Sequence, residues 1–160
     1  MRNIRFLALA ISTVAVVACN PFHRDPVTVV HQDVNMNTRW TGTLATPAAL
    51  VGAVQMNGTA IMQPNRNAAN TDFDINIANA TPGGLHPWQA YSGACGSSYW
   101  AAGQATASGS IKVGDDGRGN GKATVAMVTP TTGNYFVVVK ASQANSDVIV
   151  ACGNLAAPTT

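Results

Sequence analysis

An alternation of apolar and polar residues with a period of two dominates the chain after residue 39. In the segment TDFDINIANA, residues 71–80, Phe73, Ile75 and Ile77 alternate with Asp and Asn residues. This pattern is typical of a β-strand with one buried face and one face in water. Nowhere after residue 19 do apolar residues keep helical spacing for three turns. The pattern therefore predicts an all-β fold.

Further strand-like segments are separated by Gly, Asn, Asp and Pro, and these turn signals recur about every 8 to 12 residues. Besides residues 71–80, the predicted strands are 54–62, with a break or bulge near Asn57-Gly58, then 110–113, 123–128, 135–139 and 148–151. The segment GDDGRGNG, residues 114–121, is a hairpin signal because Asp, Asn and Gly tolerate tight turns. Together these features predict an antiparallel sandwich or barrel of about eight strands.

The N-terminus, MRNIRFLALAISTVAVVAC, is organised like a bacterial export signal. Arg2 and Arg5 precede an apolar run that is too short to span a bilayer as a stable anchor. The run ends in Val16-Val17-Ala18-Cys19, which resembles the bacterial lipobox, although Val17 is bulkier than the usual residue. In that pattern the Cys receives a diacylglyceryl group and the chain is cut just before it. An ordinary secretory signal with an incidental cysteine is the alternative.

This interpretation divides the chain into four parts. Residues 1–18 are the lipoprotein signal peptide, 19–37 the lipidated N-terminus and tether, 38–155 the β-domain and 156–160 a frayed tail. Lipid on Cys19 makes a membrane the expected partner, because each buried methylene contributes about 0.8 kcal/mol. We expect the protein in the bacterial cell envelope. Asn20, rather than Asp, after Cys19 favours the outer membrane by resemblance to lipoprotein sorting signals, on its periplasmic or exterior side.

Charge excludes one class of partner. The whole chain has 9 Lys and Arg against 7 Asp and Glu, and two of the arginines lie in the signal peptide. The mature chain is therefore formally neutral. Nucleic-acid binding needs a basic patch, so we expect no nucleic-acid partner.

The three cysteines have different expected roles. If Cys19 is acylated, Cys95 and Cys152 remain, in a compartment where disulfides persist. Two cysteines allow one pairing, whose long loop makes it worth about 4 kcal/mol in the chain-entropy model. Two buried free thiols are the alternative.

Two segments resemble the copper–zinc superoxide dismutase family and its bacterial lipoprotein relatives. They are GGLHPWQAYSGAC, residues 83–95, and YFVVVKASQANSDVIVACGNL, residues 135–155. In the family, a G-x-H-x-x-H-x-H segment leads to a Cys, and a late A-C-G supplies its partner. The resemblance spans residues 39–155 and implies an eight-stranded Greek-key sandwich or flattened barrel. It also implies a Cys95–Cys152 disulfide and a structural, non-ligating role for His86.

The metal ligands of the family are not matched. The copper-histidine positions carry Gln89, Tyr91 and Lys140, and the position of the active-site arginine carries Ile149. No histidine lies between Cys95 and Thr160, where the family has its zinc ligands. Gln is a weak neutral ligand, an unperturbed Tyr is protonated at neutral pH, and Lys is normally a cation. We therefore predict no catalytic residues, no metal and no cofactor, with copper and zinc as the alternative.

Other candidate residues carry weaker signals. His23 and His31, beside Asp25 and Asp33, are read as part of a solvated linker rather than a metal site. Ser92, Ser97 and Ser98 lie near His86 without the arrangement of a catalytic triad. Asp115, Asp116 and Asn120 lack the spacing and terminal Glu of an EF-hand, so a hairpin turn is favoured over a calcium loop. His86, beside Pro87, is expected to hydrogen-bond the backbone in a turn.

Aromatic residues cluster around the position of the former metal site. Packing is one interpretation, and a binding rim for a protein or glycan ligand is the other; the rim would comprise His86, Trp88, Tyr91, Tyr99 and Trp100. The sequence thus predicts a non-enzymatic, lipid-anchored, superoxide-dismutase-like binding or structural module, in its sharper form an envelope inhibitor or adhesin-like module. An active or copper-binding dismutase with unrecognised ligands is the alternative.

Overall fold

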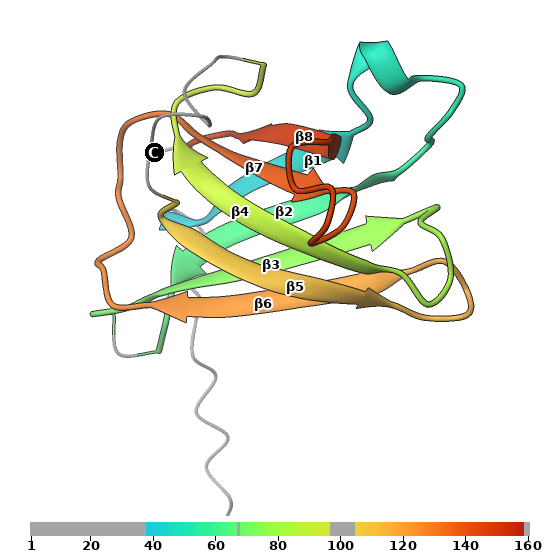
Figure 1. Ribbon diagram of the computed structural model, residues 1–160. Helices are drawn as coiled ribbons and strands as arrows, with labels where there is room; N and C mark the ends of the chain where they lie inside the picture. The colour runs from blue at the N-terminus through green and yellow to red at the C-terminus, as the bar shows by residue number, and fades with distance from the viewer. Residues whose placement is uncertain (1–37, 67, 97–104, 159–160) are drawn as a thin grey trace, which may run out of the picture. The chain divides into compact units, whose positions relative to one another are not determined.

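The computed structural model describes residues 38–66, 68–96 and 105–158. These residues form a closed antiparallel barrel of eight strands (Figure 1). The strands are β1 (Trp40–Ala45), β2 (Asn57–Pro64), β3 (Thr71–Ala78), β4 (Leu85–Ser92), β5 (Ala107–Val113), β6 (Gly119–Val125), β7 (Tyr135–Lys140) and β8 (Ile149–Leu155). A short 3-10 helix, η2 (Ala48–Leu50), lies between β1 and β2. The all-β prediction is confirmed.

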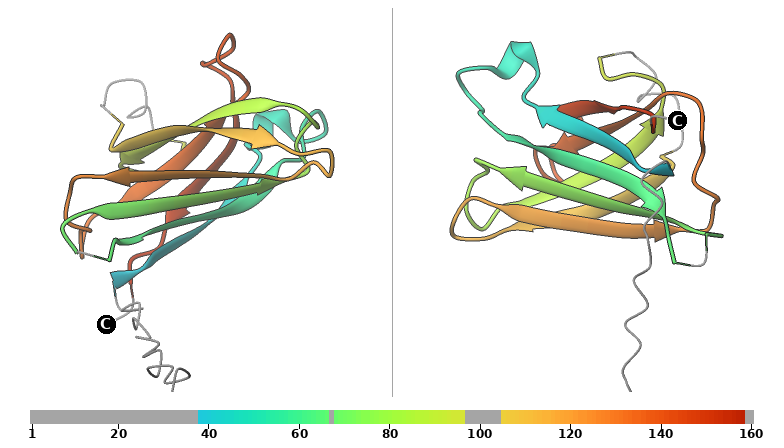
Figure 2. Two further views of the ribbon diagram at one scale, coloured as in Figure 1. Left: turned by 90° about the horizontal axis from the view of Figure 1, so that it is seen from below. Right: turned by 180° about the vertical axis from the view of Figure 1, so that it is seen from behind.

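The strand order around the barrel differs from the order along the chain. It runs β1-β2-β3-β6-β5-β4-β7-β8, and β1 closes the barrel against β8 through the pair Ala45 and Cys152. Two connections therefore cross a barrel end, residues 79–84 between β3 and β4 and residues 126–134 between β6 and β7. The crossings bring β4 and β7 side by side (Figure 2).

The alternation in the sequence decides which side chains enter the barrel. In β3, Phe73, Ile75 and Ile77 are buried, and Asp72 and Asp74 on the other face are partly exposed. Ile75 pairs with Ala60 of β2 and Gly121 of β6, so it lies on the central strand of these three neighbouring strands. The predicted wet and buried faces of this strand are confirmed.

The barrel interior is filled by large apolar side chains that are almost fully removed from water. Among them are Trp40, Leu44, Met62, Phe73, Ile75, Trp88, Ile111, Val113, Val137 and Val139. Trp88 is 0% exposed, and its indole lies over two glycines. A methyl group added at Gly109 or Gly121 would lie 2.8 or 2.5 Å from its Nε1 atom. Trp88 is therefore a core residue, as the packing interpretation expects, and the alternative of an exposed binding rim is wrong for this residue.

Several predicted boundaries shift. The strand predicted from residue 54 begins at Asn57. The hairpin prediction is confirmed, but its turn is shorter, since Gly119 already belongs to β6. The tail predicted to fray from residue 156 is tied down at its start, because Ala156 exchanges two backbone hydrogen bonds with Thr41.

The segment between β1 and β2, residues 46–56, projects beyond the strands (Figures 1 and 2). It is held by its own backbone hydrogen bonds, including Leu50 N to Pro47 O at 2.9 Å and Val54 N to Leu50 O at 3.0 Å. Val51 at its tip is 71% exposed. Among the described residues, no helix has the length and apolarity needed to cross a membrane.

Candidate functional site

A shallow polar groove lies on the outside of the barrel, across the neighbouring strands β5, β4 and β7. Its volume is about 290 Å³. The groove is lined by Pro87, Trp88 and Gln89 of β4, Ser108, Gly109 and Ser110 of β5, Lys140 of β7, and Gln143 and Ser146 of the following loop. Two of these residues, Gln89 and Lys140, stand at the positions where the resemblance places copper ligands.

Strand alternation explains why polar side chains collect here. The buried residues Trp88, Ala90 and Ile111 point into the barrel, so their neighbours point outward. The pairing of β4 with β5 sets Gln89 opposite Ser108. The same pairing sets Pro87 opposite Ser110.

Lys140 supplies the positive charge of the groove. It lies at the end of β7, next to an irregularity in the β7–β8 pairing between Val139 and Lys140. His86 fixes the backbone there, because its Nδ1 lies 3.0 Å from the carbonyl oxygen of Lys140. A carbonyl oxygen only accepts hydrogen bonds, so the Nδ1 atom donates. The single salt bridge among the described residues joins Lys122 to Asp74, so no described carboxylate forms a salt bridge with the Lys140 ammonium.

His86 itself is not part of an exposed rim. It lies within β4 rather than in a turn and is 8% exposed. The predicted backbone hydrogen bond is present, but the predicted turn and the rim position are wrong. Its second ring nitrogen, Nε2, is buried without a hydrogen-bond partner, and a methyl group added at Gly84 would lie 3.0 Å from it.

Tyr91 orients Gln89. The two residues lie two positions apart on the same strand face, and the Tyr91 hydroxyl donates to Gln89 Oε1 at 2.7 Å. Burial raises the pKa of Tyr91 above its ordinary value of 10.0, which keeps the phenol protonated and able to donate. Because the amide oxygen accepts from Tyr91, the amide NH2 group of Gln89 is left to donate elsewhere.

A small second core lies outside the barrel beside the groove. Its buried members are Tyr91, Phe136, Val138 and Cys152, and Tyr91 stacks on Phe136 with ring centroids 5.6 Å apart. At 6% exposure, Tyr91 is a packed residue, so the packing interpretation holds for it and the alternative of an exposed rim is wrong here as well.

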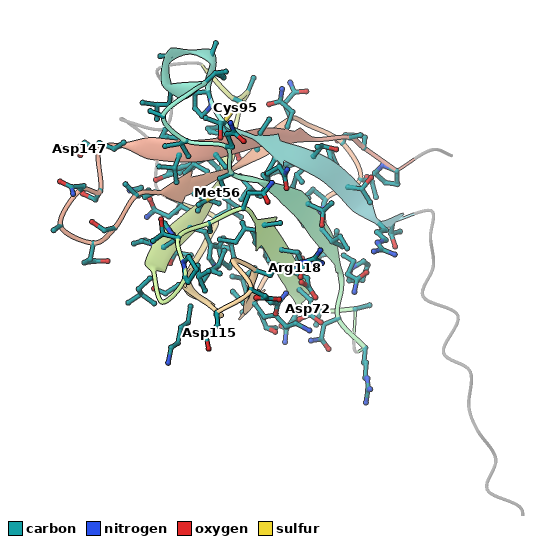
Figure 3. The ribbon with its side chains drawn as sticks, turned by 90° about the vertical axis from the view of Figure 1, so that its right-hand side faces the viewer. Met56, Asp72, Cys95, Asp115, Arg118 and Asp147 are labelled. Atoms are coloured by element: carbon teal, nitrogen blue, oxygen red, sulfur yellow. A yellow bond between two sulfur atoms is a disulfide. The ribbon has the colours of Figure 1, made fainter. Side chains whose placement is uncertain are left out.

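The disulfide between Cys95, which is labelled in Figure 3, and Cys152 closes this second core. The Cα atoms of the two cysteines are 6.0 Å apart, and they are 57 positions apart in the chain. Cys95 N also donates to Asn154 Oδ1 at 2.7 Å. The bridge ties the segment after β4 to β8, and the alternative of two free thiols is wrong.

The side chains at the positions where the resemblance places copper ligands are poor ligands for a copper ion. Lys140 carries a positive charge, Tyr91 is a neutral phenol, and the Gln89 oxygen accepts the Tyr91 proton. Ile149, at the position of the family's arginine, is paired with Lys140 across β7 and β8. The described ranges contain no group of three or more His, Cys, Asp and Glu residues that could hold a metal ion.

The residues Asp115, Asp116 and Asn120, for which the sequence favours a hairpin turn over a calcium loop, form part of a turn and a strand. Gly114 N donates to Arg118 O at 2.8 Å, and Asp116 Oδ1 accepts from Arg118 N at 3.0 Å, so the Asp116 carboxylate is used inside the turn. Figure 3 shows Asp115 and Arg118 near this end of the barrel. Asn120 lies on β6 and donates to Asp74 Oδ1 at 2.6 Å.

Several predicted sites fall outside the described residues. These are the lipidation site Cys19, the tether residues His23, Asp25, His31 and Asp33, the serines Ser97 and Ser98, and the rim residues Tyr99 and Trp100. Ser92 is exposed at the end of β4.

Sequence reasoning missed the serines and the loop residues of the groove. Ser108 and Ser110 alternate with Ala107, Gly109 and Ile111, and this alternation was a signal that both face outward. Their position beside Gln89 depends on the β4–β5 register, which local sequence does not specify.

Fold and site define the chain as a disulfide-linked, closed antiparallel β-barrel of eight strands with a polar groove on its outer face. In comparisons with known proteins, no family model and no curated protein matches the chain.

Proposed function

We propose that this chain is a lipid-anchored, metal-free protein with a superoxide-dismutase-like fold. It serves as a binding or structural module of the bacterial envelope and not as a dismutase. The observation that carries the proposal is the state of the three copper positions. They hold an ammonium group, Lys140, and a phenol and amide bonded to each other, Tyr91 and Gln89.

The strand order supports the dismutase-like part of the proposal. Strands β4, β5 and β6 are successive neighbours, and β7 returns by a longer connection to lie beside β4. This arrangement meets the definition of a Greek key. On the other side, β3 lies next to β6 and connects across the barrel end to β4, which makes a second, overlapping Greek key.

Contacts between the two segments that carry the resemblance support it further. His86 of the first segment bonds the carbonyl of Lys140 in the second, and Cys95 is bridged to Cys152. His86 and the two cysteines, which the resemblance treats as structural, thus hold the two segments together. The residues at its metal positions have side chains that disfavour a metal.

The lipid anchor rests on the sequence pattern before Cys19. Residues 20–37 would reach at most about 60 Å if extended, a length sufficient to hold a barrel beginning near residue 38 clear of a membrane. Mass spectrometry of the mature N-terminus tests this part. A diacylglyceryl group on Cys19 is expected, and an unmodified chain beginning elsewhere would overturn the anchor.

A metal-loading experiment tests the absence of dismutase activity. The full-length chain is extracted in mild detergent, loaded with Cu(II) and Zn(II), and assayed for bound metal and superoxide consumption beside an active copper–zinc dismutase. We expect no tight stoichiometric copper and no turnover. A variant with both His23→Ala and His31→Ala is the control for weak binding by the tether. Tight copper and turnover that persist in this variant would refute the proposal.

A further inference from the structure

The groove on the outer face of the barrel combines one basic side chain with several neutral polar side chains. Its one charged lining residue is Lys140, and none of the lining residues is acidic. The others with polar side chains are Gln89, Gln143, Ser108, Ser110 and Ser146. Such a set offers one positive charge, amide groups and hydroxyls within one small volume.

The donors beside Lys140 favour a carboxylate. Tyr91 occupies the oxygen of the Gln89 amide, so the Gln89 NH2 group is free to donate to an anion. Lys140 follows one residue after the pairs that join β4 to β7, in which Gln89 lies opposite Val138. An ammonium and an amide NH2 on adjoining strands can each donate to one oxygen of the same carboxylate.

The surroundings strengthen an interaction with Lys140. Val138 is 0% exposed, and Ile149 lies opposite Lys140 on β8. Apolar neighbours exclude water and lower the local dielectric constant, which increases the attraction between opposite charges. The nearest acidic residue in sequence, Asp147, is exposed (labelled in Figure 3), and it is not among the residues that line the groove.

The serines indicate what the rest of the ligand carries. Ser108 and Ser110 lie on the same face of β5, about 7 Å apart along the strand. Serine hydroxyls donate and accept, so they match ligand hydroxyls in either sense. The volume of about 290 Å³ lies just below the usual range for ligand pockets, so the groove suits only a small ligand.

We propose that this groove binds a small hydroxylated carboxylate of the sugar-acid class. Lys140 and the Gln89 amide hold the carboxylate, while Ser108 and Ser110 bind ring hydroxyls. Tyr91 is a positioning residue, because it acts by fixing the Gln89 amide. This inference rests on the proposed function, since it assigns a ligand to the same metal-free site.

An NMR titration of the isotope-labelled full-length chain in detergent micelles, with chelator present, tests the inference. The probes are sodium glucuronate, glucose and sodium acetate. Glucuronate should shift the amide signals of Gln89, Ser108, Ser110 and Lys140 in a saturable way. Glucose lacks the charge and acetate lacks the hydroxyls, so each should bind at least about tenfold more weakly.

Matched variants separate the site from general charge effects. Lys140→Gln should weaken glucuronate binding about tenfold, because it removes a charge-assisted contact. Lys112→Gln removes the same charge from an exposed position on β5 outside the groove and should leave binding unchanged. Lys140→Arg keeps the charge and should retain most of the affinity, and the amide spectrum of each variant reports whether the barrel is folded.

Three results would each overturn the inference: no saturable shift at roughly 50 mM glucuronate, equal binding of glucose, or equal losses in Lys140→Gln and Lys112→Gln. These results involve neither metal nor superoxide, so they would leave the metal-free proposal intact. Copper-dependent turnover, in contrast, would refute the proposed function whatever glucuronate does.

Discussion

The packing of Trp88 against two glycines allows a sharp test of the barrel core. In the substitution Gly121→Ala, the new methyl group would lie 2.5 Å from Trp88 Nε1 and 2.6 Å from Ile111 Cγ1. Both neighbours are 0% exposed, so neither can move outward into water. Overpacking of this kind costs about 1–3 kcal/mol, and contacts this close on two sides place Gly121→Ala near 3 kcal/mol.

Replacing the tryptophan should remove part of this cost. Trp88→Phe lacks the indole nitrogen that would contact the new methyl group, whereas the contact with Ile111 remains. Trp88→Phe also removes a buried N–H that has no hydrogen-bond partner, which offsets some of its own packing loss. We expect Gly121→Ala to cost about 1.5 kcal/mol in the Trp88→Phe background, which corresponds to a coupling energy of about 1.5 kcal/mol.

Urea unfolding of the four proteins in this double-mutant cycle measures the coupling. Gly114→Ala is the matched control, because there the nearest atom to the new methyl group is Asp116 Oδ1 at 3.0 Å, on a side chain that can move away. Its cost should stay below about 1 kcal/mol. If the costs of Trp88→Phe and Gly121→Ala add to within about 0.5 kcal/mol, Trp88 does not pack on Gly121 as described.

Two further predictions concern the second core. Removing the disulfide with Cys95→Ser and Cys152→Ser together should lower the free energy of unfolding by about 4 kcal/mol, since the bridge spans 57 positions. Urea melts should show this loss, and a reductant should destabilise the native chain but not the double variant. The pKa of Tyr91 is raised in the folded state, so the folded chain holds this proton more tightly and its stability should fall as pH rises above about 10. Tyr91→Phe should lose part of this decrease, and equal slopes of unfolding free energy against pH for both proteins would contradict the burial of the phenol.

Much of the barrel could be predicted because most of its strands alternate clearly. In β3, the spacing of Phe73, Ile75 and Ile77 identifies the buried face without further information. The hairpin between β5 and β6 follows from its Asp and Gly residues, since Gly117 has φ 72° and tolerates it without strain. Pairing of Cys95 with Cys152 needed only the cysteine count and the family resemblance.

Strand β4 shows where local sequence is insufficient. Pro87 and the neighbouring His86 suggested a turn, yet Pro87 lies just before the β4–β7 ladder, which begins at Trp88. The sequence of β4 alone could not place Trp88 in the core, because the room for its indole is left by Gly109 and Gly121, which lie on two other strands. Room for an indole depends on which glycines face each other inside the barrel, and that depends on strand order.

Strand β4 also explains how the scaffold and the groove can be specified separately. His86, Trp88 and Ala90 are the buried residues of the inward-facing set, whereas Gln89 points outward. Because successive side chains alternate, the residues that stabilise the barrel and the residue that faces the groove share a strand without sharing space. Tyr91 contributes to packing and to the groove, since its ring stacks on Phe136 and its hydroxyl donates to Gln89. A change of donor at position 89 or 140 can therefore alter what the groove binds while the core and the disulfide are retained, which is the condition that the proposed metal-free state requires.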